Sequence, residues 1–284
     1  MLQYLYNMSN PAISYTRITR VQDTLVTTTE DALAAEEPLE IWLVYGQQHC
    51  RKQQSITVTM RTPGRDAELA TGFLYTEGII KSAADIADIS AGSDKSNIIR
   101  ITLHETVVPS LGTTSRNFFS TASCGVCGKT DIASIYAPVT GQQPETAAAS
   151  WHSSLILQLP EVLRQQQQVF EDTGGLHAAA LFDQQGQLVL LREDIGRHNA
   201  VDKVIGAALQ QQDFVPDRYI LLLSGRAGFE LIQKAAVAGI RLIAAVGAPS
   251  SMAVRIAAER DITLIGFLRE QRFNIYTGEK RIVF

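Results

Sequence analysis

Two of the three cysteines in this 284-residue chain, Cys124 and Cys127, form a CxxC pair in the sequence Ser-Cys-Gly-Val-Cys-Gly that begins at residue 123. The glycines around them let the backbone turn tightly and leave both sulfur atoms accessible. The next residue, Lys129, and a helix start that Thr130 and Asp131 can cap would favour the thiolate, the reactive form of cysteine. Two thiols at this spacing can form a redox pair, supply half of a metal site, or relay sulfur.

The metal interpretation of this pair lacks ligands. A zinc site needs four protein ligands, or three and a water molecule. Cys124, Cys127 and one histidine could supply three, but the chain has no second CxxC. We therefore expect no metal site.

The oxidoreductase interpretation stays open. In thioredoxin-type proteins the CxxC opens a helix directly after a strand, whereas here the long polar segment 109–123 precedes it. Loops of that length in compact proteins are usually functional or disordered. Because this one leads directly to the two cysteines, we expect it to be functional. The third cysteine, Cys50, has no second thiol near it in the sequence, and we expect it to be a small packing residue.

Three turns rich in glycine or serine follow predicted strands in the second half of the chain. The first contains Arg197 and His198, the second contains Ser224 and Arg226, and the third spans 247–251. A strand, such a turn and a helix point free backbone N–H groups at an anion, and open α/β sheets bind ligands beyond the carboxyl ends of their strands. The two arginines favour a phosphorylated, nucleotide-like ligand, although well-capped structural turns have the same composition.

His177 follows a Gly-Gly pair and begins an alanine-rich predicted strand. It is either a hydrogen-bonded core residue or a member of the same site. No Lys-Ser or Lys-Thr follows a GxxxxG run, so the sequence does not predict ATP or GTP hydrolysis.

The spacing of apolar residues predicts an α/β protein in two parts, with largely parallel pairing at the centre of the second. We expect residues 1–135 to form a β-rich N-terminal subdomain that carries the CxxC loop, and residues 136–284 to form an α/β domain that binds the cofactor or ligand. The first 22 residues are predicted to be a poorly determined leader with a weak strand pattern at 15–21. The expected elements are strands 36–46 and 54–61, helix 66–80, strand 98–103, helix 160–170, a hairpin of strands 176–182 and 188–192, helix 199–210, strand 219–223, helix 229–238, strand 241–246, helix 252–259, and strands 262–266 and 272–276.

Composition narrows the class of protein. The formal net charge of -4 and the isoelectric point near 5.8 argue against a nucleic-acid partner. An odd number of cysteines argues against a secreted disulfide framework, and the N-terminus lacks a signal peptide. The longest apolar run, residues 235–248, is too short to span a bilayer and contains Arg241. We expect a cytoplasmic protein with no membrane contact.

An ordered set of motifs gives a more specific indication. It comprises Glu-Glu-Pro at 36–38, Gly-Phe-Leu-Tyr-Thr-Glu-Gly-Ile-Ile at 72–80, Cys-Gly-Val-Cys-Gly at 124–128, Thr-Gly-Gly-Leu-His-Ala-Ala at 173–179, Glu-Asp-Ile-Gly-Arg-His-Asn-Ala-Val-Asp-Lys at 193–203 and Ser-Gly-Arg at 224–226. In this order the motifs resemble those of the formate dehydrogenase accessory sulfurtransferase family (FdhD), from about residue 36 to the C-terminus. The resemblance implies a cytidine-deaminase-like three-layer α/β core, a smaller β-rich N-terminal subdomain and a homodimer. Deaminase chemistry is not implied, because no Glu stands two residues after His177 and no PCxxC occurs.

The resemblance also implies a function. The family's proteins are sulfurtransferases: they accept persulfide sulfur from a cysteine desulfurase and pass it to the bis-molybdopterin guanine dinucleotide form of the molybdenum cofactor, which formate dehydrogenase requires. The persulfide would form on Cys124, with Cys127 assisting. A dithiol oxidoreductase and a non-catalytic cofactor-insertion chaperone are the alternatives.

The resemblance places a cofactor-binding segment after the penultimate strand. It corresponds to Phe267, Leu268, Arg269, Glu270, Gln271 and Arg272, which we group with His177, Arg197, His198, Ser224 and Arg226 as cofactor-binding residues. The family's Lys-Pro-Gly-Arg type of turn is replaced here by Arg-Glu-Gln-Arg, which puts the backbone geometry of this segment in doubt.

Overall fold

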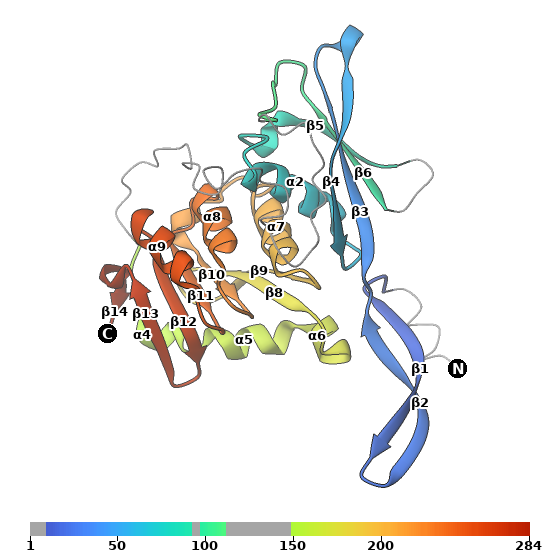
Figure 1. The fold of residues 1–284 in the computed structure, drawn as a ribbon. Helices are drawn as coiled ribbons and strands as arrows, with labels where there is room; N and C mark the ends of the chain where they lie inside the picture. Colours follow the sequence, from blue (N-terminus) through green and yellow to red (C-terminus); the bar gives the residue numbers. More distant parts are fainter. Residues whose placement is uncertain (1–9, 93–96, 112–148) are drawn as a thin grey trace.

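The computed structural model describes residues 10–92, 97–111 and 149–284. In Figure 1 these residues form an α/β body, a smaller sheet with one helix, and a long hairpin that extends away from both. The predicted subdomain boundary between residues 135 and 136 lies outside the described residues, as do Cys124 and Cys127. No helix in the described ranges is long and apolar enough to cross a membrane.

The α/β body is built on a six-stranded sheet with strand order β13-β12-β11-β10-β8-β9. β10 pairs in parallel with β11, and β11 pairs in parallel with β12, whereas the outer pairs are antiparallel. The predicted parallel centre is therefore confirmed. The strands are β8 (His177–Phe182), β9 (Leu188–Asp194), β10 (Ile220–Leu223), β11 (Leu242–Ala245), β12 (Thr263–Arg269) and β13 (Arg272–Thr277).

Helices cover both faces of this sheet, which explains why β10 and β11 are apolar at every position and buried throughout. One face packs against α7 (Arg197–Ala208), α8 (Phe229–Val237) and α9 (Ser251–Glu259), through strand residues such as Leu223 and Ile243. The other face packs against α4 (Ser153–Ile156) and α5 (Leu159–Gln166), through residues such as Leu222 and Ala244. The result is the three-layer arrangement visible in Figure 1.

The predicted helix 160–170 is wrong at its centre. The backbone leaves the helical conformation at Gln167, where φ is -82° and ψ is 72°, and α6 (Gln168–Thr173) begins after it. The reason lies on β9, where the Glu193 carboxylate accepts hydrogen bonds from the backbone N–H groups of Val169 and Phe170. These bonds satisfy donors at the start of a new helix.

Short elements complete both halves of the described structure. β7 (Trp151–His152) pairs in parallel with β14 (Ile282–Val283), which ties the C-terminus to the start of the body. The 3-10 helices are η1 (Gln48–Cys50), η2 (Ala83–Asp85), η3 (Pro216–Arg218) and η4 (Glu279–Arg281).

The smaller sheet has strand order β4-β3-β6-β5, with β3 and β6 parallel. The strands are β3 (Glu37–Tyr45), β4 (Lys52–Arg61), β5 (Ile86–Ala91) and β6 (Ile98–Leu103), and α2 (Asp66–Thr76) covers one face through an aliphatic core. The predicted strands and helix are confirmed, except that α2 ends before residue 80 and β5 was not predicted. Gly78, at φ +70°, turns the chain away after α2.

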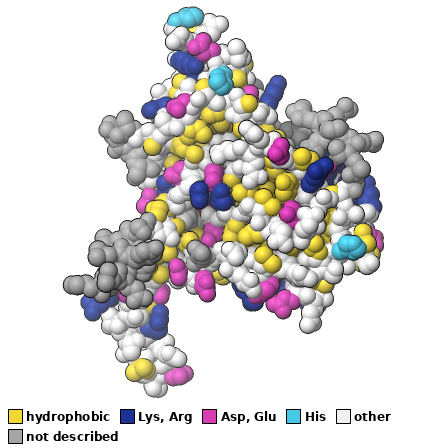
Figure 2. Space-filling model, turned by 180° about the vertical axis from the view of Figure 1, so that it is seen from behind, with side chains coloured by type: hydrophobic (Ala, Val, Ile, Leu, Met, Phe, Trp, Pro, Cys, Tyr) yellow, Lys and Arg dark blue, Asp and Glu magenta, His cyan; other side chains and the backbone are white. Residues whose placement is uncertain are grey.

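Residues predicted to form a leader instead form a hairpin of β1 (Ile13–Gln22) and β2 (Leu25–Ala34). Most of its side chains are exposed, including Val21, Leu25 and Val26 near the tip, each more than 60% exposed. In Figure 2 the hairpin is the lobe at the lower left, with a hydrophobic side chain at its end. Since neither face is buried, the sequence carries little alternation of apolar and polar residues to mark it.

The two halves meet where α2 crosses α7. A Cβ atom built on Gly72 would lie 1.9 Å from the backbone oxygen of Asp202, and one built on Gly206 would lie 1.9 Å from the backbone oxygen of Glu68. Only glycine fits at either position, because no real Cβ approaches another atom so closely. The two helix backbones are therefore in direct contact.

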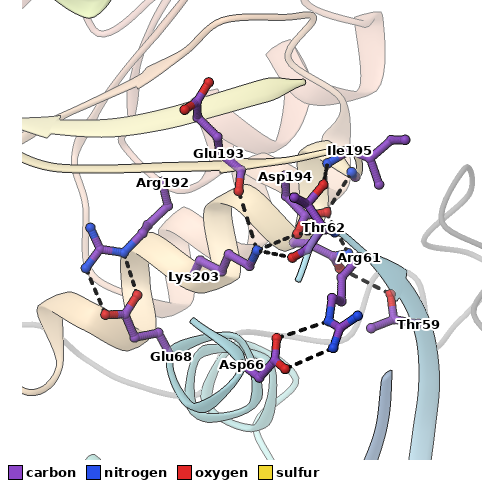
Figure 3. Close-up of polar contacts among 12 residues, drawn as sticks. Thr59, Arg61, Thr62, Asp66, Glu68, Arg192, Glu193, Asp194, Ile195 and Lys203 are labelled. Carbon is purple, nitrogen blue, oxygen red and sulfur yellow. Dashed lines mark hydrogen bonds and ion pairs between the residues drawn. The ribbon is translucent and has the colours of Figure 1, made fainter. Parts of the chain in front are cut away.

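Buried ion pairs surround this crossing, as Figure 3 shows for one side. The Lys203 Nζ lies 2.7 Å from the Asp194 Oδ2 and donates to the Thr62 carbonyl at 2.9 Å. Arg61 forms a two-bond pair with Asp66, and Arg192 forms one with Glu68. The Arg192–Glu68 bonds join β9 to α2, and the Lys203–Thr62 bond joins α7 to the end of β4, so these bonds fix the orientation of the two halves.

A second buried pair lies on the α8 side of the crossing. The Lys234 Nζ lies 3.0 Å from Asp202 Oδ2 and 3.0 Å from Glu77 Oε1, and it donates to Thr76 Oγ1 at 2.9 Å. Burial alone would lower the pKa of Lys234, but the two carboxylates outweigh it and raise the pKa above its ordinary value. The lysine is therefore charged and links α8 to both α7 and α2.

Replacing Gly72 by alanine tests this contact. The new methyl group would overlap the Asp202 carbonyl, so α2 and α7 would have to separate, and we expect the free energy of unfolding in urea to fall by about 3 kcal/mol or more. Gly175→Ala is the control, because its Cβ would meet Ala34 at an ordinary 3.5 Å. Equal unfolding midpoints for both variants would contradict the direct contact of the two backbones.

Candidate functional site

The topology of the sheet brings four loop segments to one edge. β8 runs antiparallel to β10, so its first residue, His177, lies beside the carboxyl ends of β10, β11 and β12. The Ala178 N–H donates to Ser224 Oγ at 2.8 Å, the Gly247 N–H to the Gly225 carbonyl at 2.9 Å, and the Phe267 N–H to the Gly247 carbonyl at 3.1 Å. These bonds hold the edge in a fixed geometry.

A cavity of about 530 Å³ opens at this edge, between the strand ends and α5. Among its walls are five of the predicted cofactor-binding residues, namely His177, Ser224, Leu268, Arg269 and Glu270. Leu163, Leu176 and Val246 add apolar surface. The topology therefore gathers residues that lie almost a hundred positions apart in the sequence.

Charged side chains at this cavity have both signs. Arg269 is held by the carbonyl oxygens of Val246 and Leu268, which accept from Nη1 at 2.7 and 3.2 Å. Arg164 on α5 pairs with Glu161 and approaches Glu270 at 4.0 Å across the opening. Guanidinium groups bind phosphate, and carboxylates accept N–H groups of a base, so the chemistry suits a nucleotide.

A second hollow of about 570 Å³ lies between α4, α5 and the turn at Gly186. No charged side chain or histidine is among its described lining residues. It therefore offers less to an anionic ligand than the cavity at the sheet edge.

The segment 267–272 forms a tight hairpin. β12 ends at Arg269 and β13 begins at Arg272, these two residues face each other, and only Glu270 and Gln271 connect them. Phe267 lies in a bulge with φ +52°, a conformation that costs a bulky residue about 1–2 kcal/mol, and its side chain is 40% exposed. A strained and exposed aromatic residue at a ligand edge is typical of a functional position.

The other predicted residues are not among the cavity's lining residues: Phe267, Gln271 and Arg272 belong to the hairpin beside it, and the remaining three lie elsewhere on the edge. Arg197 and His198 begin α7, and Arg226 lies in the connection from β10 to α8. His198 Nε2 lies 3.9 Å from Oε2 of Glu230, a residue on α8 that we did not predict. Only its place two residues after Gly228, in the first turn of a helix, could have indicated it.

Several of these groups act electrostatically on His177. Burial lowers the pKa of the His177 imidazole, and Arg197, His198 and Arg226 lower it further, against the attraction of Asp194. Burial works to raise the pKa of Glu230, but His198 and Arg197 lower it below its usual value. The imidazole of His177 is therefore neutral at pH 7, and the Glu230 carboxylate is charged.

Some residues of the motif at 193–203 stabilise the junction between the two halves, whereas others lie at the candidate site. Asp194, Asn199 and Lys203 bond to the end of β4 and to Thr62, and Asp202 bonds to Thr76 and Lys234. Among the motif's charged side chains in the described structure, Glu193 and Arg197 form no ion pair, and Glu193 accepts backbone N–H groups of α6 instead.

The structure tests the prediction for one of the three cysteines. Cys124 and Cys127, predicted to be catalytic, are outside the described residues, so their roles stay predictions. Cys50 is exposed in η1, so the expectation that it packs inside is wrong. Among the described residues, no three potential ligands come together to hold a metal ion.

Comparison with known proteins supports one family. A model of the FdhD/NarQ family matches residues 34–283. Proteins named sulfur carrier protein FdhD from Streptomyces avermitilis and Mycolicibacterium paratuberculosis are 45% and 48% identical, over 94% and 89% of this chain and 94% and 92% of theirs. A crystal structure described as a putative formate dehydrogenase accessory protein from Desulfotalea psychrophila shares the fold, with a TM-score of 0.71 at 22% identity over 96% of this chain and all of that one.

The charges around His177 give a prediction for its titration. We expect the His177 imidazole to titrate below the usual histidine pKa of about 6.5, and Arg197→Gln to move its pKa upward, because a nearby positive charge is lost. The measurement is an NMR titration of the histidine ring protons. Arg218→Gln, an exposed arginine near the opposite end of β10, is the control and should move nothing. A His177 pKa at or above the usual value would show that the arginines do not act on it.

Proposed function

This chain belongs to the FdhD/NarQ family, and from that premise we propose that it is a cytoplasmic sulfurtransferase. In this proposal it accepts persulfide sulfur from a cysteine desulfurase and passes it to the bis-molybdopterin guanine dinucleotide molybdenum cofactor that formate dehydrogenase requires. Relatives that match over most of the chain are named sulfur carrier proteins, which supports the first part. A further partner in the proposal is a second copy of the chain, as a homodimer.

The observation that carries the acceptor half of the proposal is the cavity at the sheet edge. Its volume of about 530 Å³ falls in the range of about 300–1,000 Å³ typical of small-molecule sites, which suits one nucleotide arm. Arg269 would bind phosphate oxygens, and Glu270 would accept N–H groups of the guanine base. The acceptor is the substrate here, and these residues bind and orient it.

The thiols supply the carrier half. In the proposed loading step the Cys124 thiolate attacks the outer sulfur of the donor persulfide, a new S–S bond forms, and the desulfurase cysteine leaves as its thiolate. No external oxidant or reductant is needed, because one S–S bond replaces another. Cys127 is proposed to assist.

Mass spectrometry of the intact protein tests the loading step. After incubation with a cysteine desulfurase and cysteine, we expect a gain of one sulfur atom, located on Cys124 by peptide mapping. Cys124→Ala should abolish formate dehydrogenase activation, Cys127→Ala should reduce it severely, and Cys50→Ala, an exposed third cysteine, is the matched control.

The rival functions give different results in the same experiment. A loss of two hydrogens from a reversible Cys124–Cys127 disulfide, without added sulfur, would favour a dithiol oxidoreductase. Full activation by the Cys124→Ala variant in a strain lacking the native gene would favour an insertion chaperone.

Phe267 does not line the cavity but directly precedes Leu268, which does, so its exposed ring gives a test of how far acceptor binding extends along the hairpin. Phe267→Asn removes an exposed ring that a base can stack on and places at φ +52° a residue that tolerates this conformation. We expect the affinity for GDP to fall by about tenfold, the lower range of base stacking energies, while stability changes by less than about 1 kcal/mol. Calorimetry measures the first and urea unfolding the second, with Phe284→Asn, 80% exposed at the C-terminus, as control. Unchanged GDP affinity in Phe267→Asn would remove the ring from the site.

A further inference from the structure

The cations beside His177 differ from those at the helix crossing. Arg61, Arg192, Lys203 and Lys234 each pair with a carboxylate. Within the described ranges no carboxylate lies at ion-pair distance from Arg197 or Arg226. Arg226 is exposed to solvent, and the nearest carboxylate to His198 is that of Glu230, so two arginines share one neighbouring carboxylate and the region keeps a net positive charge that attracts an anion.

The positions of these side chains define one cluster. Arg197, His198 and Arg226 form the cationic cluster, which follows the carboxyl ends of β9 and β10, and the neutral ring of His177 at the start of β8 lies beside it. The His177 ring reaches it because residue 225 is glycine, where a Cβ atom would lie only 3.1 Å from His177 Nδ1.

His198 provides a second and independent observation. Its side chain is 13% exposed, and its Nε2 atom is buried without a hydrogen-bond partner in the described part of the chain. The nearest carboxylate oxygen, on Glu230, is 3.9 Å away, beyond hydrogen-bond distance. Buried ring nitrogens are rarely left without a hydrogen-bond partner. A ligand that binds here would supply the partner that the His198 Nε2 atom lacks.

We propose that Arg197, His198 and Arg226 form a second anion site, which acts independently of the cavity and binds the terminal anionic group of a ligand. The cavity has its own arginines for phosphate, Arg164 and Arg269. Guanidinium is weakly hydrated and suits a large, soft anion such as a sulfane sulfur, the terminal sulfur of a persulfide. A phosphate group has the same charge requirement and is the other source of such an anion. The choice of sulfane sulfur rests on the proposed function, whereas the site itself does not.

The site can be tested with thiosulfate, which carries a terminal sulfane sulfur, and with GDP. Titrations by calorimetry use the full-length chain with Cys50, Cys124 and Cys127 replaced by serine, which excludes covalent reaction with the probe. We expect Arg197→Gln/Arg226→Gln to weaken thiosulfate binding by about tenfold or more, the loss of one to two charge-assisted hydrogen bonds, and to leave GDP binding unchanged. Arg269→Gln should do the reverse, and Arg218→Gln should change neither.

Each outcome decides a separate question. Equal loss of both ligands in Arg197→Gln/Arg226→Gln, or no loss of thiosulfate binding, would overturn the second site. Tighter binding of thiosulfate than of inorganic phosphate identifies the ligand as sulfane sulfur, and the reverse order identifies it as phosphate; both support the site. If Cys124 acquires no sulfur from a desulfurase while thiosulfate still depends on the two arginines, the proposed function fails and the site stands.

Discussion

The direct contact of Gly72 on α2 with Gly206 on α7 is the constraint on which the rest of the structure depends. Because the two helix backbones touch, the side chains that flank the crossing are excluded from water and must be paired. The Asp194–Lys203 and Asp202–Lys234 pairs meet that requirement within the α/β body, and the two lysines also bond to Thr62 and Thr76, which joins the body to the smaller half. Removing one partner of such a pair leaves a buried charge, which is far more costly than the pair itself is stabilising.

The same contact positions the functional edge. α7 crosses α2 along its length and begins at Arg197, so the crossing also fixes where Arg197 and His198 lie at the carboxyl edge of the sheet. The antiparallel course of β8 brings His177 to that edge from the opposite direction. His177 consequently lies between two chemically different regions, a cavity with mixed charges and a cluster of cations. This separation suits the proposed function, in which a nucleotide-bearing acceptor and an anionic sulfur would be held near each other.

The apolar patterns predicted most of the fold, including α2 and the order of elements from β8 to β13, because a buried face leaves a period in the sequence. The β1–β2 hairpin left no such period, and the break at Gln167 depends on Glu193, which is distant in the sequence. The sequence predicted the candidate site only in part. Turn composition indicated the residues around Ser224, but only the fold shows that Arg197 is separate from the cavity. Nothing in the sequence indicated that Gly72 is a helix contact.

The central claim is that the acceptor's nucleotide arm binds at the carboxyl edge of the sheet. Hydrogen–deuterium exchange of the full-length protein with saturating GDP measures this most directly. The account predicts slower exchange in peptides that cover 174–178, 224–228 and 267–272, with no change in β3 and β4. Protection confined to the smaller sheet or the β1–β2 hairpin, with none at these three segments, would contradict it.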